Sequence, residues 1–162
     1  MSEEQIKYQK HYIPLTRDEL VERLHLALRP KRFNHVLRVE KTAIKLAKTN
    51  GVDPEKASIA GLCHDYAKQR PDDVFIQVIK DKKMSPELLN YGNAIWHGVV
   101  GAELLKDELG IWDEDILNAV RHHTTGAAIM SKLEQVIYMA DYIEPARDFD
   151  GVQTARKITA DD

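Results

Sequence analysis

The sequence is short of cysteine, of long apolar runs and of net charge, and each shortage argues against a class of protein. The single cysteine, Cys63, excludes an intramolecular disulfide and argues against a thiolate metal cluster. No apolar stretch approaches the roughly 20 residues that a membrane-spanning helix needs. The first five residues also lack the basic and apolar regions of a signal peptide. With a net charge of −3, no basic field attracts nucleic acid or anionic lipid. We therefore expect a cytoplasmic protein that binds neither nucleic acid nor a membrane.

Alternating strand patterns, repeats and low-complexity segments are also missing, and signals of helix starts and ends take their place. Residues 16–19 and 131–134 form capping boxes, and Asp53-Pro54-Glu55 is typical of a helix start. Helices are expected over about 17–29, 32–50, 54–65, 93–110, 113–123 and 131–145, with shorter ones from 71, 86 and 152. The sequence predicts one all-α domain over residues 16–162, a bundle of about seven to nine helices. A loosely held N-terminal extension, residues 1–15, precedes it.

The pair His64-Asp65 stands at the end of a predicted helix made of small apolar residues. Ionisable side chains are rare on such a buried helix unless something binds them. A metal ion is the simplest candidate, because histidine offers a neutral nitrogen and aspartate offers oxygens. The alternative is an ordinary polar helix end.

Helical periodicity places further histidines and an acid on inward faces. His35 and His97 each lie on a predicted buried or half-buried face, and a core imidazole bonded to a backbone carbonyl is the alternative for each. Of the adjacent pair at 122 and 123, His123 is expected to face the core and His122 the solvent. Asp141 continues the apolar face of its helix, where a buried salt bridge is the alternative to a metal.

Together these residues suit a cation that accepts nitrogen and oxygen ligands. The set, contributed by five predicted helices, is His35, His64, Asp65, His97, His123 and Asp141. Such ligands favour iron, manganese, zinc or cobalt, and the lack of thiolates weakens a structural zinc interpretation.

Several residues near this set are candidates for binding phosphate. Lys68 follows Asp65 by three residues, Arg32 precedes His35 by three, and Arg147 follows Asp141 beyond a proline turn. Thr124, Thr125 and Gly126 follow a predicted helix end and offer hydroxyl and backbone N–H groups. A solvated lysine or arginine and a plain turn are the respective alternatives.

The order His35, His64-Asp65, Asp141 resembles the H…HD…D signature of the HD-domain superfamily of metal-dependent phosphohydrolases. Longer segments are similar to the HD-domain symmetrical bis(5'-nucleosyl)-tetraphosphatases, which split diadenosine tetraphosphate into two ADP. These segments are HDYAK at 64–68, WHG at 96–98, HTTG at 123–126 and ADYIEPAR at 140–147. The resemblance covers roughly residues 15–155. His122 replaces a residue that is often aromatic in that family, and the chain ends at Asp162 sooner than expected, which leaves open whether a C-terminal helix is truncated.

This resemblance implies an iron centre held by His35, His64, Asp65 and Asp141. His97 and His123 either hold a second ion bridged by Asp65 or contact phosphate. Asp65 and Lys68 are the expected catalytic residues. The predicted substrate-binding residues are Arg32, Lys68, Thr124, Thr125, Gly126 and Arg147.

We therefore expect hydrolysis of diadenosine tetraphosphate by metal-activated water, with ADP as product. The alternatives are a nucleotidase or dNTPase of the same superfamily and a nucleotide-binding module without turnover. The sequence leaves open whether the protein forms a homodimer.

Overall fold

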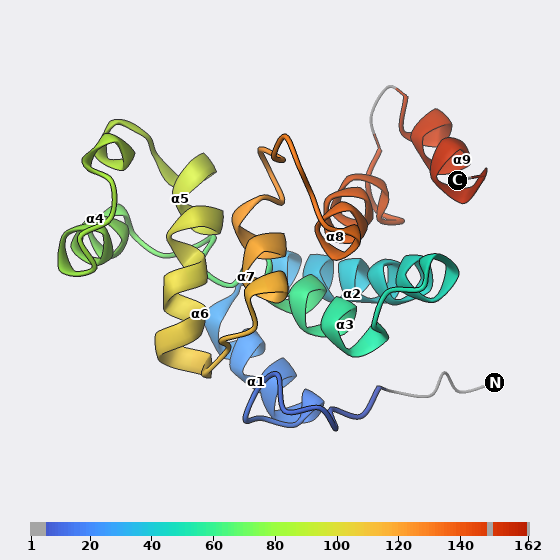
Figure 1. Cartoon of the computed structure of the whole chain (residues 1–162), viewed down its shortest axis with the longest axis horizontal. Helices are drawn as coiled ribbons and strands as arrows, with labels where there is room; N and C mark the ends of the chain where they lie inside the picture. The colour runs from blue at the N-terminus through green and yellow to red at the C-terminus, as the bar shows by residue number, and fades with distance from the viewer. Residues whose placement is uncertain (1–5, 149–150, 162) are drawn as a thin grey trace.

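The computed structural model describes residues 6–148 and 151–161, which form helices and no strand (Figure 1). The elements are α1 (Arg17–Ala27), α2 (Pro30–Asn50), α3 (Pro54–Cys63), α4 (Asp72–Asp81), the 3-10 helix η1 (Pro86–Asn90), α5 (Asn93–Val99), α6 (Gly101–Leu109), α7 (Glu114–Arg121), α8 (Lys132–Ile143) and α9 (Val152–Asp161). The predicted all-α fold is confirmed. Within these ranges, no helix is both long and apolar enough to cross a membrane.

The helix α3 lies along α2, and α7 and α8 cover this pair (Figure 1). The small residues of α3 allow the close approach to α2. At Gly61 an added Cβ would lie 3.0 Å from Glu40 Cα, so the two backbones nearly touch there. This contact brings the C-terminal end of α3, and with it His64-Asp65, against the middle of α2, which carries His35.

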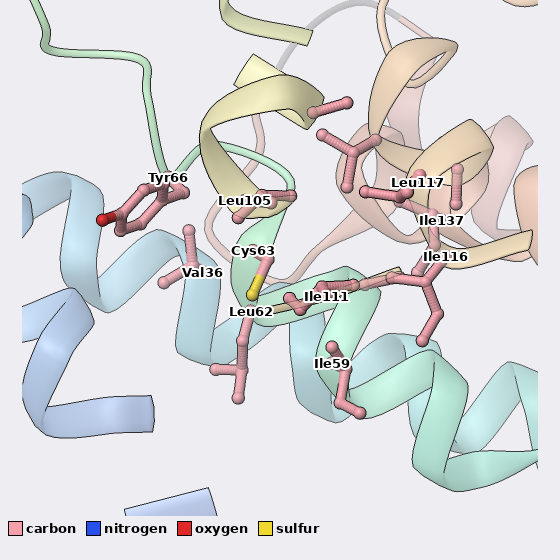
Figure 2. Close-up of a cluster of buried hydrophobic side chains, with 14 of the residues drawn as sticks. Val36, Ile59, Leu62, Cys63, Tyr66, Leu105, Ile111, Ile116, Leu117 and Ile137 are labelled. Carbon is pink, nitrogen blue, oxygen red and sulfur yellow. The ribbon is translucent and has the colours of Figure 1, made fainter. Parts of the chain in front are cut away.

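The apolar core is built by side chains from every α-helix from α1 to α8. Figure 2 shows part of it, with Ile59 and Leu62 of α3 near Cys63, and with Ile116, Leu117 and Ile137 contributed from α7 and α8. Each of these large side chains is almost fully buried, which contributes about 1.5–3 kcal/mol relative to exposure. The core therefore anchors the helices whose ends carry the ionisable residues.

Local chemistry explains most helix boundaries. Both predicted capping boxes are present, at Thr16 with Glu19 and at Ser131 with Glu134. The predicted helix over 93–110 is instead two helices, α5 and α6, which meet at Val100. The helix expected to run through residue 123 ends at Arg121, so both following histidines lie in the turn after α7.

Residues 6–15 pack against the start of α3, although the sequence suggested a loose segment. The Glu55 carboxylate accepts hydrogen bonds from the backbone N–H groups of Gln9 and Lys10. The Tyr12 hydroxyl donates to Asp53 at 2.8 Å, and Ile13 is buried. Two acids that begin α3 therefore also hold this N-terminal segment, whereas residues 1–5 lie outside the described ranges.

Candidate metal centre

The six predicted metal-site residues converge from five places in the fold. His35 lies within α2, His64 and Asp65 follow α3, His97 is in α5, His123 follows α7 and Asp141 is in the last turn of α8. The four histidines and Asp65 are buried, and the Asp141 side chain is 17% exposed. The convergence is the feature that sequence periodicity predicted.

Four candidate ligand atoms, two imidazole nitrogens and two carboxylate oxygens, lie close together. The Asp141 Oδ1 atom lies 3.0 Å from His35 Nε2 and 3.6 Å from His64 Nε2. The Asp65 Oδ2 atom lies 3.6 Å from His35 Nε2 and 3.5 Å from His64 Nε2. Two nitrogens and two oxygens at these separations match the donors that a borderline divalent cation accepts.

The Nε2 atoms of His35 and His64 are buried and have no hydrogen-bond partner among the described residues. The Nδ1 atom of His64 is 2.6 Å from the Gly61 carbonyl oxygen, which can only accept, so Nδ1 carries the proton. In the neutral ring the Nε2 lone pair faces the two carboxylates, so either a second proton or a cation must lie between them. An unpaired buried polar atom is costly, and coordination of a cation removes that cost. These residues thus fit a metal ion.

His97 and His123 form a second group on the other oxygen of Asp65. Both of their Nε2 atoms lie 3.4 Å from Asp65 Oδ1, and they are 3.0 Å from each other. Their Nδ1 atoms donate to the carbonyl oxygens of Asn93 and Val120, each at 2.7 Å. Two neutral imidazoles so arranged direct lone pairs at each other, which a shared cation or a proton relieves. One carboxylate oxygen of Asp65 therefore lies near His35 and His64, and the other lies near His97 and His123.

Electrostatics keep the carboxylates ionised. Burial alone would raise the pKa of Asp65, but His64, His123 and His97 hold it well below its usual range. Burial likewise opposes ionisation of Asp141, and His35 and His64 outweigh it and lower its pKa. Burial lowers the pKa of His123, which keeps this ligand neutral. Desolvation also acts to lower the pKa of His64, and Asp65 and Asp141 raise it to about 9.

Two of the predicted phosphate-binding cations contact the metal-site carboxylates directly. Arg32 Nη1 donates to Asp65 Oδ2 at 2.9 Å. Arg147 Nη2 donates to Asp141 Oδ1 at 2.9 Å, and its Nε donates to the Asp141 carbonyl. Lys68 is half-buried, and its backbone N–H donates to the Asp65 carbonyl. Its ammonium group makes no hydrogen bond or ion pair within the described ranges.

A pocket of about 430 Å³ opens beside Asp141. It is lined by His123, Thr124, Tyr138, Asp141, Tyr142 and Arg147. Thr124 therefore lines the pocket. Thr125 is not among the lining residues, and its hydroxyl donates to the Gly126 carbonyl. Gly126 forms the turn itself, at φ +68.

Sequence reasoning missed the two tyrosines of this pocket, and it misplaced His122. Tyr138 lies three residues before Asp141 and Tyr142 one after it, so helical spacing was the available signal. His122 was expected to face solvent, but it is only partly exposed because it pairs with Glu134, the acid of the α8 capping box.

Comparison with known proteins identifies close relatives. The family model described as the HD domain matches residues 32–146. A symmetrical bis(5'-nucleosyl)-tetraphosphatase of Bacillus subtilis is 45% identical over 148 residues, which cover 91% of this chain and 80% of the relative. The enzyme of the same name from Halalkalibacterium halodurans is 46% identical over 125 residues, or 77% of this chain and 67% of the relative.

Solved structures share the fold. The crystal structure of a Clostridium acetobutylicum HD superfamily hydrolase, described as involved in NAD metabolism, superposes with a TM-score of 0.85 at 42% identity. The match covers 91% of this chain and 79% of that protein. An HD superfamily hydrolase from an uncultured Thermotogales bacterium matches with a TM-score of 0.55 at 21% identity, a likeness of fold alone.

Proposed function

The chain belongs to the HD-domain family and, within it, to the symmetrical bis(5'-nucleosyl)-tetraphosphatases, and on that premise we propose that it hydrolyses diadenosine tetraphosphate to two ADP at a divalent metal centre. The observation that carries the proposal is the buried cluster in which two imidazole nitrogens point at carboxylates and make no hydrogen bond within the described part of the chain. A cytoplasmic location and a homodimer stay predictions from the sequence.

We assign His35, His64, Asp65 and Asp141 as ligands of one ion. The donor set suits iron, which the family resemblance favours, and also manganese, cobalt or zinc. The four distances that join the imidazole nitrogens to the carboxylate oxygens, 3.0–3.6 Å, support this assignment.

We assign His97, His123 and the second oxygen of Asp65 to a second ion. The alternative role, donation of a hydrogen bond to phosphate, requires a proton on Nε2 of either histidine. Because each Nδ1 already holds the proton for a carbonyl oxygen, a neutral ring offers only a lone pair at Nε2. The depressed pKa of His123 favours the neutral form and so the metal role.

A divalent ion at this centre supplies two things, a lowered pKa for a bound water and charge withdrawal from phosphoryl oxygens. The side chains of the chain do the rest. Arg32 and Arg147 hold the two ligand carboxylates in place and present remaining N–H groups to a polyphosphate. We assign the Lys68 ammonium, which is unpaired within the described ranges, to the transferring or leaving phosphate.

The pocket beside Asp141 is the proposed site for one nucleoside of the substrate. Its volume of about 430 Å³ is within the range of small-molecule sites. The rings of Tyr138 and Tyr142 offer faces on which a purine stacks, and the Thr124 hydroxyl offers a hydrogen bond. The Arg147 side chain lines this pocket and contacts Asp141, so it joins the nucleoside site to the metal centre.

The test is to load purified protein with Fe²⁺ or Mn²⁺ without oxygen, add diadenosine tetraphosphate and separate the products by chromatography. ADP alone is expected, whereas AMP with ATP would exclude symmetrical cleavage. Faster turnover of mononucleotides would favour a nucleotidase or dNTPase, and binding without turnover would favour a binding module.

Two variants show whether the activity belongs to this site. His64→Ala and Asp65→Ala remove metal ligands and are expected to abolish turnover. His25→Ala is the matched control, because His25 is exposed on α1 and outside the cluster. Unchanged activity in both ligand variants would trace the signal to a contaminant.

A further inference from the structure

Glu144 is a buried acid next to the metal centre that the proposed ligand set does not use. It follows α8 directly, three residues after Asp141, and its side chain is 2% exposed. One carboxylate oxygen, Oε2, accepts from Arg38 Nε at 2.7 Å and from the Ala146 N–H at 3.0 Å. The other oxygen, Oε1, lies 3.5 Å from His35 Nδ1.

Among the four histidines of the centre, His35 differs in what faces its Nδ1 atom. In His64, His97 and His123 that atom bonds to a backbone carbonyl three or four residues earlier. For His35 the group that faces Nδ1 is a side chain, the Glu144 carboxylate, rather than a carbonyl of its own helix. A carboxylate from the end of another helix therefore takes the place that a local carbonyl takes for the other three.

We propose that Glu144 is a positioning residue that fixes the tautomer and orientation of His35, an inference that rests on the proposed function. The carboxylate holds the proton on His35 Nδ1, so the Nε2 lone pair stays directed at Asp141 and Asp65. An anionic partner also makes the imidazole a stronger ligand than a neutral carbonyl does. His35 is thus the proposed ligand whose orientation depends on a side chain rather than on a backbone carbonyl.

The same carboxylate supports the substrate side of the site. By accepting the Ala146 N–H it closes the turn that follows α8, and the Glu144 carbonyl accepts the Arg147 N–H at 2.9 Å. That turn brings Arg147 back onto Asp141. Glu144 therefore connects a metal ligand in α2 with the arginine that lines the pocket.

The experiment compares Glu144→Gln with wild type and with Glu40→Gln. Glutamine keeps the size of the side chain and an oxygen acceptor, and it removes the charge. Glu40 is the matched control because it is also buried and paired with an arginine, Arg17, but lies outside the cluster. The readouts are the dissociation constant of Mn²⁺, measured by chelator competition, and the thermal denaturation of the metal-free proteins.

We expect Glu144→Gln to weaken Mn²⁺ binding by about 10–100-fold. The Glu40→Gln change should leave this constant within about twofold of wild type, even where it lowers the melting temperature, because the Glu40 carboxylate bonds to Arg17 and Ser58 and to none of the proposed ligands. Equal affinity of wild type and Glu144→Gln would overturn the positioning role and leave the metal centre standing. Failure of wild type itself to bind Mn²⁺ would overturn the proposed function as well.

A measurement on the wild type decides the question if Glu144→Gln does not fold. In the Zn²⁺-loaded protein, nitrogen–proton NMR correlations of the imidazoles report which nitrogen carries the proton. A proton on His35 Nδ1, shifted downfield of those on the three carbonyl-bonded rings, is expected next to a carboxylate. A ring without a proton on Nδ1 would contradict the inference.

Discussion

Replacement of Gly98 by alanine should damage the second group of ligands without unfolding the protein. Gly98 follows His97 in α5, and an added Cβ would lie 2.9 Å from the Val120 carbonyl oxygen. That oxygen accepts the hydrogen bond that orients His123. One methyl group therefore presses on the backbone atom that holds a proposed ligand of the second ion.

The expected displacement follows from the contact distance. Ordinary van der Waals contact of a Cβ begins at about 3.4 Å, so the carbonyl must retreat by about 0.5 Å, the difference between 3.4 and 2.9. Metal–ligand distances tolerate only about 0.2 Å. A misplacement of 1 Å can reduce a rate by about 100-fold, so we expect the turnover number to fall by about tenfold.

The stability of the variant should change less than its activity. Overpacking lowers the free energy of unfolding by about 1–3 kcal/mol, and alanine in place of glycine inside a helix raises it by about 1 kcal/mol. The net loss is about 0–2 kcal/mol. The matched control is Gly51→Ala at the end of α2, where φ is +70 and no atom lies within 4 Å of an added Cβ. Its left-handed backbone makes alanine cost about 1–2 kcal/mol far from the centre.

The assay measures turnover of diadenosine tetraphosphate, metal content by elemental analysis and the unfolding transition in urea for both variants. Gly98→Ala should lose activity and bind closer to one ion per chain than two, whereas Gly51→Ala should keep both properties at comparable stability. A folded Gly98→Ala protein with full activity and full metal content would refute the idea that this backbone contact positions His123.

Two further predictions concern the C-terminal helix and the response to acid. Arg156 of α9 donates to the carbonyl oxygens of Ile143, Glu144 and Arg147, so Arg156→Ala should loosen the Arg147 turn. We expect a KM for diadenosine tetraphosphate raised by several-fold at unchanged metal content, and an unchanged KM would contradict this. The pKa of Glu108 is lowered from 4.5, first by its hydrogen bonds to Arg70, so its stabilisation is present above that pH and is lost as the pH falls below it. Glu108→Gln should therefore be less stable than wild type at neutral pH, by under about 1 kcal/mol because the pair is partly exposed. In acid urea titrations the difference should shrink from about pH 4.5 downward and vanish once the pH is below the lowered pKa of folded Glu108. A difference that stays constant down to the lowest pH at which both proteins fold would show that the ion pair is not its cause.

Short-range chemistry made much of this protein predictable. A helix start is coded within four residues, which is why the capping boxes at Thr16 and Ser131 and the start at Asp53 were found from sequence. Ligand types and helical spacing likewise identified His64, Asp65 and Asp141 as a set. The break of the 93–110 segment at Val100 was not predicted, although Gly98 and Gly101 on either side of it weaken a helix locally.

What the sequence alone determined is therefore which groups are present and that His35, His97 and Asp141 lie on inward faces of helices. Only the tertiary structure decided how Asp65 shares its two oxygens, that Arg147 returns to Asp141 and that Glu144 faces His35. The physical reason is the distance along the chain between the residues that interact. A cap or a helix face depends on atoms within one or two turns, whereas these contacts join segments that are brought together only when α2, α3, α5, α7 and α8 bury their apolar sides in one core.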